Sequence, residues 1–282
     1  MSDWGDTRDG ARSALKAAGL ATARALLKAG SAVGRAVKAG VDSVDPDVWT
    51  HAADLPLVAL TMLARTKRAV DDMPDDGRVP VLFVHGLAGH PGNFLPMRTY
   101  FRAMGRPRTH AVALPGDCSV EVLGTVLADT VEAAAARAPN AEVDVVAHSL
   151  GGLVARAALL ELERRGSAAR VRTLVTLGTP HAGSHLARYA NTVTTRDLRP
   201  GSPLLERLGA QLPWRGPPAQ PRLIAFWSKA DVLVLPVEAA TVEGADNREL
   251  PGLSHNGLLL SPSAWEAVLQ ALADAAPPSR AP

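Results

Sequence analysis

The chain contains a single cysteine, Cys118. It therefore cannot form an internal disulfide, and its cysteine usage gives no indication of an oxidising compartment. We interpret Cys118 as a small, semi-buried residue and not as a catalytic thiol. Charge of one sign is also scarce, because the net charge of the 282 residues is only +2 and no cluster of basic and aromatic residues is present. So small a positive excess gives no basis for a nucleic-acid-binding function.

The sequence also lacks an apolar run long enough to cross a bilayer. The apolar stretch 55–64 is far shorter than the roughly 20 residues that a transmembrane helix needs. Residues 1–6 hold neither a basic stretch nor an apolar core of the kind found in secretory signals. We therefore expect a cytoplasmic protein without signal peptide or transmembrane helix. A peripheral contact with a membrane surface is compatible with this location.

The apolar residues that are present predict an α/β protein. They make up 47% of the chain, which is ample for a buried sheet, and the length suits one large domain with an additional segment. Apolar β-branched runs alternate with helical patterns, as in a mostly parallel central sheet with helices on both faces. The expected strands are 79–85, 109–114, 142–147, 171–177, 222–228 and a weaker one near 240–248, and the expected helices are 92–104, 119–138, 150–165 and 263–275.

A serine follows the third of these strands. The segment Val143–Gly152 reads Val-Asp-Val-Val-Ala-His-Ser-Leu-Gly-Gly, and a helix-forming run continues directly from it. This is the layout of a nucleophile elbow, in which a sharp strand-to-helix turn raises a serine hydroxyl above the sheet. The residues two before and two after the serine must be small to avoid the strand and the helix, and they are Ala147 and Gly151. Ser149 is therefore the candidate nucleophile.

The first strand ends in a histidine and a glycine-rich loop. In this architecture the oxyanion hole takes one backbone N–H from that loop and one from the residue after the nucleophile. The candidate donors are the backbone amides of Leu87 and Leu150. Gly86 and Gly89 allow the loop to bend, and Leu150 lies in the first turn of a helix, where N–H groups have no intrahelical acceptor.

A carboxylate and a histidine complete the constellation. Asp231 comes just after the strand 222–228, and His255 lies in a glycine-bounded loop before the last helix. The histidine would take the proton of the serine, and the aspartate would fix the tautomer of the imidazole. The chain order serine, aspartate, histidine is that of the α/β-hydrolases and not that of chymotrypsin or subtilisin. Asp246 and Glu243, near the next strand, are alternative sources of the carboxylate.

These motifs carry a resemblance to a known family. The elbow Ala-His-Ser-Leu-Gly is similar to that of a subset of small bacterial lipases. Leu177–Ser184 resembles the segment that these lipases carry after the strand following the elbow helix, and Asp197–Leu205 resembles part of their lid region. Over residues 78–276 the chain thus resembles a bacterial lipase or esterase of the α/β-hydrolase superfamily. The resemblance implies a cofactor-independent serine hydrolase that cleaves carboxylic esters, with lipid or acylglycerol esters as its substrates.

Other functions remain open. Thioesterases and acyltransferases use the same three residues, and they differ from esterases in pocket shape, which the sequence does not give. A non-catalytic, membrane-associated protein can also keep a hydrolase scaffold. The intact serine, aspartate and histidine speak against that alternative, because scaffolds freed from catalysis tend to lose the nucleophile or the base. Acyl chain length and oligomeric state stay open as well.

The remaining histidines receive other interpretations. We interpret His85 and His148 as structural residues that hold the loop and the elbow. His181 and His185 stand four residues apart and can share a helical face as metal ligands. Because no carboxylate or cysteine accompanies them at ligand spacing, we expect neither a metal site nor a cofactor.

Two segments lie outside the expected sheet. Residues 184–221 combine prolines and glycines with apolar residues and lack a clear strand, which is typical of a lid or cap over an active site. Residues 1–75 are expected to form a helical N-terminal extension, and 277–282 a flexible tail, leaving 76–276 as the hydrolase domain. Within 10–45 basic residues accompany an apolar helical face, so this part is expected either to lie on an anionic membrane surface, to pack on the hydrolase domain or to be a partly disordered arm.

Overall fold

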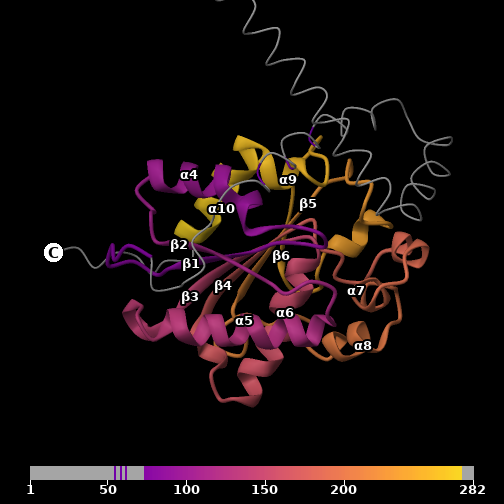
Figure 1. Cartoon of the computed structure of the whole chain (residues 1–282), viewed down its shortest axis with the longest axis horizontal. Coiled ribbons are helices and arrows are strands. Elements are labelled where there is room, and N and C mark those ends of the chain that lie inside the picture. Colours follow the sequence, from indigo (N-terminus) through magenta and orange to yellow (C-terminus); the bar gives the residue numbers. More distant parts are fainter. Residues whose placement is uncertain (1–53, 55–57, 59–60, 62–72, 275–282) are drawn as a thin grey trace, which may run out of the picture.

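The computed structural model of the protein describes residues 73–274 together with Asp54, Val58 and Thr61 (Figure 1). The basic segment 10–45, for which membrane docking, packing on the hydrolase domain and a partly disordered arm were the open alternatives, and the expected tail at 277–282 lie outside the described residues. No helix in the described part of the chain combines the length and the apolar character needed to cross a membrane.

The described chain is built around one parallel sheet. Its six strands lie in the order β2-β1-β3-β4-β5-β6, and every neighbouring pair is parallel. The predicted fold class, a parallel sheet with helices on both faces, is confirmed. The strands are β1 (Val81–Val84), β2 (Thr109–Val112), β3 (Val143–His148), β4 (Val171–Leu177), β5 (Arg222–Trp227) and β6 (Asp246–Glu249).

All four predicted helices are present, and further short helices that were not predicted lie at 193–197, 203–209 and 257–260. The segment predicted as one helix from 92 to 104 begins with a 3-10 turn, because Pro91 and the capping side chain of His90 start η3 before α4. The strand expected from 240 starts only at Asp246, because η7 extends to Ala240 and a turn follows it. The α-helices are α4 (Leu95–Ala103), α5 (Val120–Ala135), α6 (Leu150–Arg164), α7 (Val193–Asp197), α8 (Pro203–Gly209), α9 (Gly257–Leu260) and α10 (Pro262–Asp274), and the 3-10 helices are η3 (Pro91–Phe94), η4 (Pro139–Ala141), η5 (Ala168–Arg170), η6 (His185–Tyr189) and η7 (Val237–Ala240).

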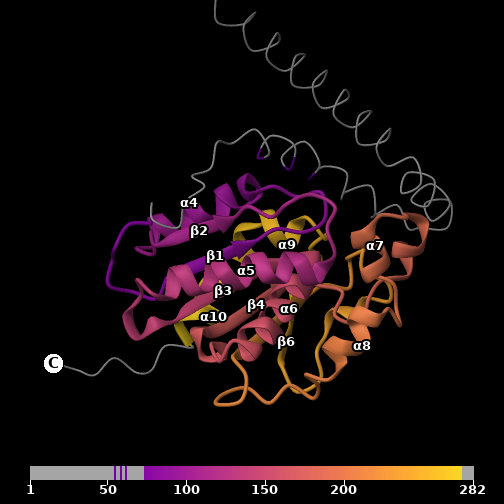
Figure 2. The ribbon, with the colours of Figure 1, turned by 60° about the horizontal axis from the view of Figure 1, so that its bottom comes forward.

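Helices cover both faces of the sheet (Figures 1 and 2). Helices α5 and α6 lie on one face, and α4, α9 and α10 lie on the other. Alternate side chains of a strand point to opposite faces, so in β1 Leu82 and Val84 join the core under α5 and α6, whereas Val81 and Phe83 join the core under α4 and α10. This double burial explains why β1 is a continuous apolar run and why apolar residues dominate β5.

The two edge strands differ from the inner ones and from each other. All four residues of β2 are buried, and Arg98 of α4 donates a hydrogen bond to the carbonyl oxygen of Thr109 at 2.9 Å. Strand β6 is short and charged, and its Asp246 carboxylate pairs with Arg222 and Arg248. The carboxyl ends of β1, β3, β4 and β5 meet at one edge of the sheet, where ligands bind in open α/β sheets.

Candidate active site

Ser149 occupies the turn between β3 and α6. Its φ of 56° and ψ of −130° lie outside the regions that non-glycine residues ordinarily adopt, so the backbone is strained at this position. Gly151 explains how the turn is accommodated, because a Cβ atom there would lie 2.4 Å from the carbonyl oxygen of Val84. Ala147, on the other side of the serine, is completely buried. The close approach of Val84 therefore requires a residue without a Cβ atom at position 151, and the side chain of Ala147 is fully enclosed.

Hydrogen bonds from the neighbouring strand fix this turn. The backbone N–H of Ser149 donates to the carbonyl oxygen of Leu177 at 2.9 Å, and the Thr179 hydroxyl donates to the carbonyl oxygen of Ser149 at 2.8 Å. A Cβ atom on Gly152 would come within 2.1 Å of the Thr179 hydroxyl oxygen, so the first turn of α6 packs directly on this threonine. Thr179 belongs to the segment that resembles bacterial lipases, but no local pattern indicated this role.

His255 and Asp231 form a buried pair. His255 Nδ1 and Asp231 Oδ2 lie 2.7 Å apart, and the two side chains are both more than 90% buried. The other carboxylate oxygen, Oδ1, accepts the backbone N–H groups of Leu233 at 2.8 Å and Val234 at 3.1 Å. Burial raises the pKa of Asp231, but the charge and hydrogen bond of His255 and the two N–H donors outweigh it, so the pKa lies below its ordinary value. Asp231 is therefore ionised at neutral pH.

The alternative carboxylates lie elsewhere. Asp246 pairs with Arg222 and Arg248, and Glu243 is exposed to solvent. The carboxylate that contacts His255 is thus that of Asp231.

His148 supports the loop that carries His255. Its Nε2–H donates to the carbonyl oxygen of His255 at 2.9 Å, and the two rings pack with their centroids 4.7 Å apart. Burial, with a smaller repulsion from His255, lowers the pKa of His148 to about 3. The ring is therefore neutral at neutral pH and acts as a hydrogen-bond donor to the loop, in line with the structural role that the sequence suggested.

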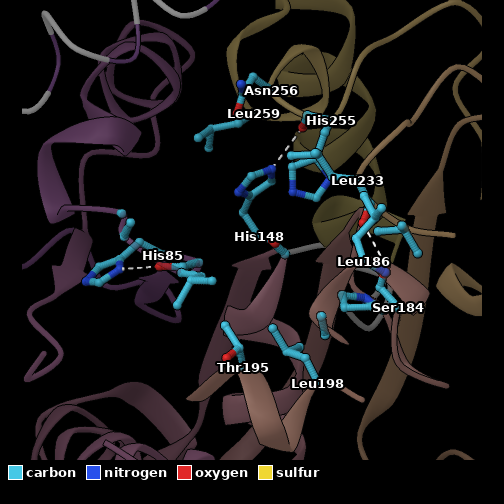
Figure 3. A pocket seen from close by; sticks show the side chains of 18 of the residues that line it. His85, His148, Ser184, Leu186, Thr195, Leu198, Leu233, His255, Asn256 and Leu259 are labelled. Atoms are coloured by element: carbon cyan, nitrogen blue, oxygen red, sulfur yellow. Dashed lines mark hydrogen bonds between the residues drawn. The ribbon is translucent and has the colours of Figure 1, made fainter. Parts of the chain in front are cut away.

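Ser149 and His255 line the same pocket (Figure 3), which has a volume of about 260 Å³. Figure 3 shows the rings of His148 and His255 side by side, with Leu259 above them and Leu198 below. In the described chain no direct hydrogen bond joins the Ser149 hydroxyl to the His255 ring; such contacts often tighten only when substrate is bound. The walls are mainly apolar, and no lysine, arginine, aspartate or glutamate is among the described residues that line the pocket.

The two amides predicted for an oxyanion hole flank Ser149. A Cβ atom on Gly86 would lie 2.7 Å from Ser149 Cβ and 3.3 Å from Ser149 Oγ, so the loop after β1 passes beside the serine side chain. Leu87, the next residue, lines the pocket, and Ala88 follows it with a φ of 54°. Leu150 is the first residue of α6, where its N–H has no intrahelical acceptor and the helix dipole favours negative charge.

His85 and His181 are buried near the pocket but contact other groups. His85 Nδ1 bonds to the carbonyl oxygen of Gly86 at 3.1 Å, and burial lowers its pKa. His181 Nε2 bonds to the Thr176 hydroxyl at 3.1 Å, and burial followed by the charge of Arg156 lowers its pKa well below the ordinary value. Among the described residues, no group of three or more His, Cys, Asp or Glu side chains is arranged to hold a metal ion.

The segment 184–221, here called the cap segment, is attached to the rest of the domain at several points. The Ser184 hydroxyl donates to the carbonyl oxygen of Leu233 at 2.9 Å, next to the Asp231 loop. Farther along, Asp197 accepts the N–H of Val120 at 2.8 Å and so caps the start of α5. The contact of Ser184 with Leu233 and that of Asp197 with Val120 join distant parts of the chain, so no local sequence pattern indicates them.

A buried arginine holds the second half of the cap segment. Arg156 of α6 is 1% exposed and donates to the carbonyl oxygen of Leu208 at 2.6 Å and to the side-chain oxygen of Gln211 at 2.9 Å. Burial lowers its pKa to about 10, so it remains charged at neutral pH. The cap segment is therefore fastened to both α5 and α6.

Comparison with known proteins agrees with this architecture. A family model described as a domain of unknown function (DUF7379) matches residues 123–254, which include Ser149 and Asp231 and end one residue before His255. Among solved structures, the mature form of the Bacillus licheniformis lipase BlEst2 is similar with 17% identity and a TM-score of 0.59, over 71% of this chain and 94% of that one.

Two fungal structures extend the comparison. Aspergillus fumigatus lipase B is similar with 16% identity and a TM-score of 0.58, over 77% of this chain and 57% of that chain. An esterase structure from Rhizomucor miehei is similar with 17% identity and a TM-score of 0.52, over 72% of this chain and 77% of that chain. At such identities the likeness concerns the fold, and the chain has the α/β-hydrolase fold.

Proposed function

We propose that the protein is a serine hydrolase that cleaves carboxylic esters, with lipid or acylglycerol esters as its substrate class, through an acyl-enzyme on Ser149. The observation that carries the proposal is the joint placement of a strained serine and a buried His255–Asp231 pair in one apolar pocket. This combination supplies a nucleophile, a base and an orienting carboxylate. The similar solved structures are themselves described as lipases and esterases.

The reaction follows from the positions of the protons. Because Nδ1 of His255 donates to Asp231, Nε2 is the basic nitrogen that takes the Ser149 proton as the serine oxygen attacks the ester carbonyl carbon. The carbonyl oxygen becomes an oxyanion that accepts hydrogen bonds from the amides of Leu87 and Leu150. Collapse breaks the bond to the alcohol oxygen, which leaves with the proton from Nε2.

Water completes the cycle. It attacks the acyl-enzyme while His255 Nε2 removes its proton, and the acid is released as the proton returns to the Ser149 oxygen. Throughout, the ionised Asp231 stabilises the imidazolium that forms on His255. The ester and one water molecule are the reactants, and the side chains of Ser149, His255 and Asp231 carry the catalytic roles.

The pocket favours neutral, apolar acyl groups. Leucines at 186, 198, 233 and 259 supply apolar surface, and the described lining has no charged side chain of Lys, Arg, Asp or Glu to pair with a charged substrate. A buried ion without a partner is costly, so charged acyl groups would bind poorly. The pocket volume of about 260 Å³ is slightly below the range typical of small-molecule pockets, about 300–1,000 Å³.

The test is hydrolysis of p-nitrophenyl esters from acetate to palmitate by the purified protein. Ser149→Ala removes the nucleophile and should lower kcat by roughly 10⁴-fold or more. Ser263→Ala, an exposed serine on α10, is the matched control and should retain the activity. Circular dichroism would establish that all three proteins are folded.

Activity that disappears only in Ser149→Ala supports the proposal, and the chain-length profile then separates a lipase from a short-chain esterase. If the folded wild-type protein hydrolyses none of these esters, ester hydrolysis is the wrong reaction, and acyl-thioester substrates and acyl transfer become the functions to measure.

A further inference from the structure

Residues that precede the first strand by 20 or more positions contact the site. The described residues Asp54, Val58 and Thr61 lie against two loops that carry catalytic groups: the loop around His255 and the turn that follows Leu87. All three fall within the part of the chain that the sequence placed in a separate N-terminal extension. The contact with the histidine loop is polar, and the contact near the pocket wall is partly apolar.

The first contact is polar and reaches the histidine loop. The Ser254 hydroxyl donates a hydrogen bond to the Asp54 carboxylate, and the same hydroxyl oxygen accepts the backbone N–H of Gly257 at 2.8 Å. Ser254 is 6% exposed and directly precedes His255. Because the Ser254 hydroxyl donates its proton to Asp54, its oxygen is oriented to accept the N–H of Gly257. The Asp54 carboxylate therefore helps to set the conformation of the turn 254–257, which carries the His255 imidazole.

The histidine loop is therefore held from two sides. His148 donates to the carbonyl oxygen of His255 from β3 at 2.9 Å, and Asp54 holds the preceding residue from the opposite end of the chain. Asp231 fixes the ring itself. A displacement of a catalytic group by about 1 Å can lower the reaction rate about 100-fold. The contacts of His148 and Asp54 with the histidine loop therefore affect proton transfer between Ser149 and His255.

The second contact is partly apolar and reaches the pocket wall. Val58 lines the same cavity as Ser149 and His255. Its carbonyl oxygen accepts the Thr61 hydroxyl at 2.7 Å and the Asn93 side-chain amide at 3.3 Å, and Asn93 also donates to the Thr61 hydroxyl at 2.8 Å. Asn93 is 3% exposed and lies in η3, directly after the oxyanion loop.

We propose that Asp54 is a positioning residue for His255 and that Val58 is a specificity-determining residue of the acyl pocket. The catalytic unit then includes Asp54, Val58 and Thr61. The expected effects on kcat and KM rest on the proposed ester hydrolysis. The effect of Asp54 on the conformation of the histidine loop can be measured without any turnover.

The test uses the full chain and compares Asp54→Ala with Asp54→Asn. The alanine variant removes the acceptor of Ser254 and should lower kcat about 10- to 100-fold on p-nitrophenyl esters while KM stays within about twofold. The asparagine variant keeps an oxygen acceptor and should restore most of the loss. Asp129→Ala, which removes an exposed carboxylate of α5 paired with Arg165, is the matched control and should behave like the wild type.

Hydrogen exchange measured by mass spectrometry provides the readout that is independent of activity. Asp54→Ala should accelerate exchange in the peptide that spans 253–257, where the Gly257 N–H is bonded to Ser254, and leave β3 and β4 protected. Val58→Ala should instead raise KM for longer acyl esters with kcat unchanged, because it removes contact area and no catalytic group.

Three results would overturn the inference. The first is an Asp54→Ala enzyme with wild-type kcat and wild-type exchange at 253–257. The second is a loss of protection throughout the sheet, which would make Asp54 a general stability residue. The third is a Val58→Ala enzyme with unchanged KM for every ester. If the wild-type protein proves inactive on esters, the proposed function fails, and accelerated exchange confined to 253–257 still supports the positioning role of Asp54.

Discussion

Ser149 and His148 are adjacent in the chain and are held by different forces. Ser149 keeps a left-handed backbone because hydrogen bonds from Thr179 and to Leu177 surround the turn. His148 is held by burial, and its neutral ring donates a single hydrogen bond to the loop of His255. The backbone strain at Ser149 is thus local. The burial of the neutral His148 ring, in contrast, makes the free energy of unfolding depend on pH.

The depressed pKa of His148 has a predictable effect on stability. Below its ordinary pKa of 6.5 the unfolded chain binds a proton that the folded chain, with a pKa of about 3, does not. The free energy of unfolding must therefore fall as the pH is lowered through this window, with a slope of about 1.4 kcal/mol per pH unit for this one group. His148→Gln keeps an N–H donor without the ionisation.

Urea unfolding at several pH values between 6.5 and 4 would measure this slope for the wild type and for His148→Gln. We expect a shallower dependence in the variant. Parallel curves for the two proteins would show that His148 does not ionise differently in the folded and unfolded states.

At the scale of elements, the elbow depends on how closely α6 approaches β1. The Cβ that Gly151 lacks would meet backbone oxygens of Val84 and His85 at 2.4 and 2.8 Å. Backbone atoms cannot rotate away as side chains can, so the helix or the strand would have to shift. The same close approach of α6 to β1 brings the start of α6, with Leu150, near the loop after β1, which passes beside Ser149. The packing of α6 on β1 therefore also brings together the two segments of the candidate oxyanion hole.

Gly151→Ala should therefore destabilise the fold. Overpacking of this kind typically costs about 1–3 kcal/mol, which would appear as a lower midpoint in urea unfolding. Gly116→Ala is the matched control, since a Cβ there would have no atom within 4 Å. Equal midpoints for the two variants would contradict the steric argument.

The elements themselves were largely predictable, because strand and helix patterns depend on residues near one another in the sequence. The same is true of Ser149, whose small neighbours are a local requirement, and the order of Asp231 and His255 follows from the ends of predicted elements. The contacts of Thr179 with Ser149 and of Asp54 with Ser254 span 30 and 200 residues. Such contacts arise only when the whole chain folds, and no local pattern marks them.

At the scale of the whole molecule, the site is assembled from loops at the ends of five strands (β1, β3, β4, β5 and β6) and from residues before the sheet. The cap segment and the histidine loop are both fastened to the sheet domain by buried or partly buried hydrogen bonds. Residues 10–45, where the sequence combines basic residues with an apolar helical pattern, precede all of these contacts in the chain. We predict that this segment binds an anionic lipid surface and that this binding is separable from ester cleavage.

Deletion of residues 10–45 tests this division. We expect the truncated protein to lose its binding to anionic liposomes, because the basic amphipathic segment is absent, and to keep its activity on soluble esters. Liposome co-sedimentation and p-nitrophenyl ester assays of the same preparations measure the two properties. Equal liposome binding by the truncated protein would show that membrane docking resides elsewhere.

The edges of the sheet also govern how copies of the protein meet. An exposed, flat edge strand offers unpaired backbone groups on which another chain can add a strand. Here β2 is buried along its length and Arg98 is bonded to its Thr109 carbonyl oxygen, and β6 is four residues long and carries paired charges. Within the described sheet, neither edge is a long, flat and exposed strand, so we expect this sheet to resist extension into continuous, fibril-like sheets by strand addition.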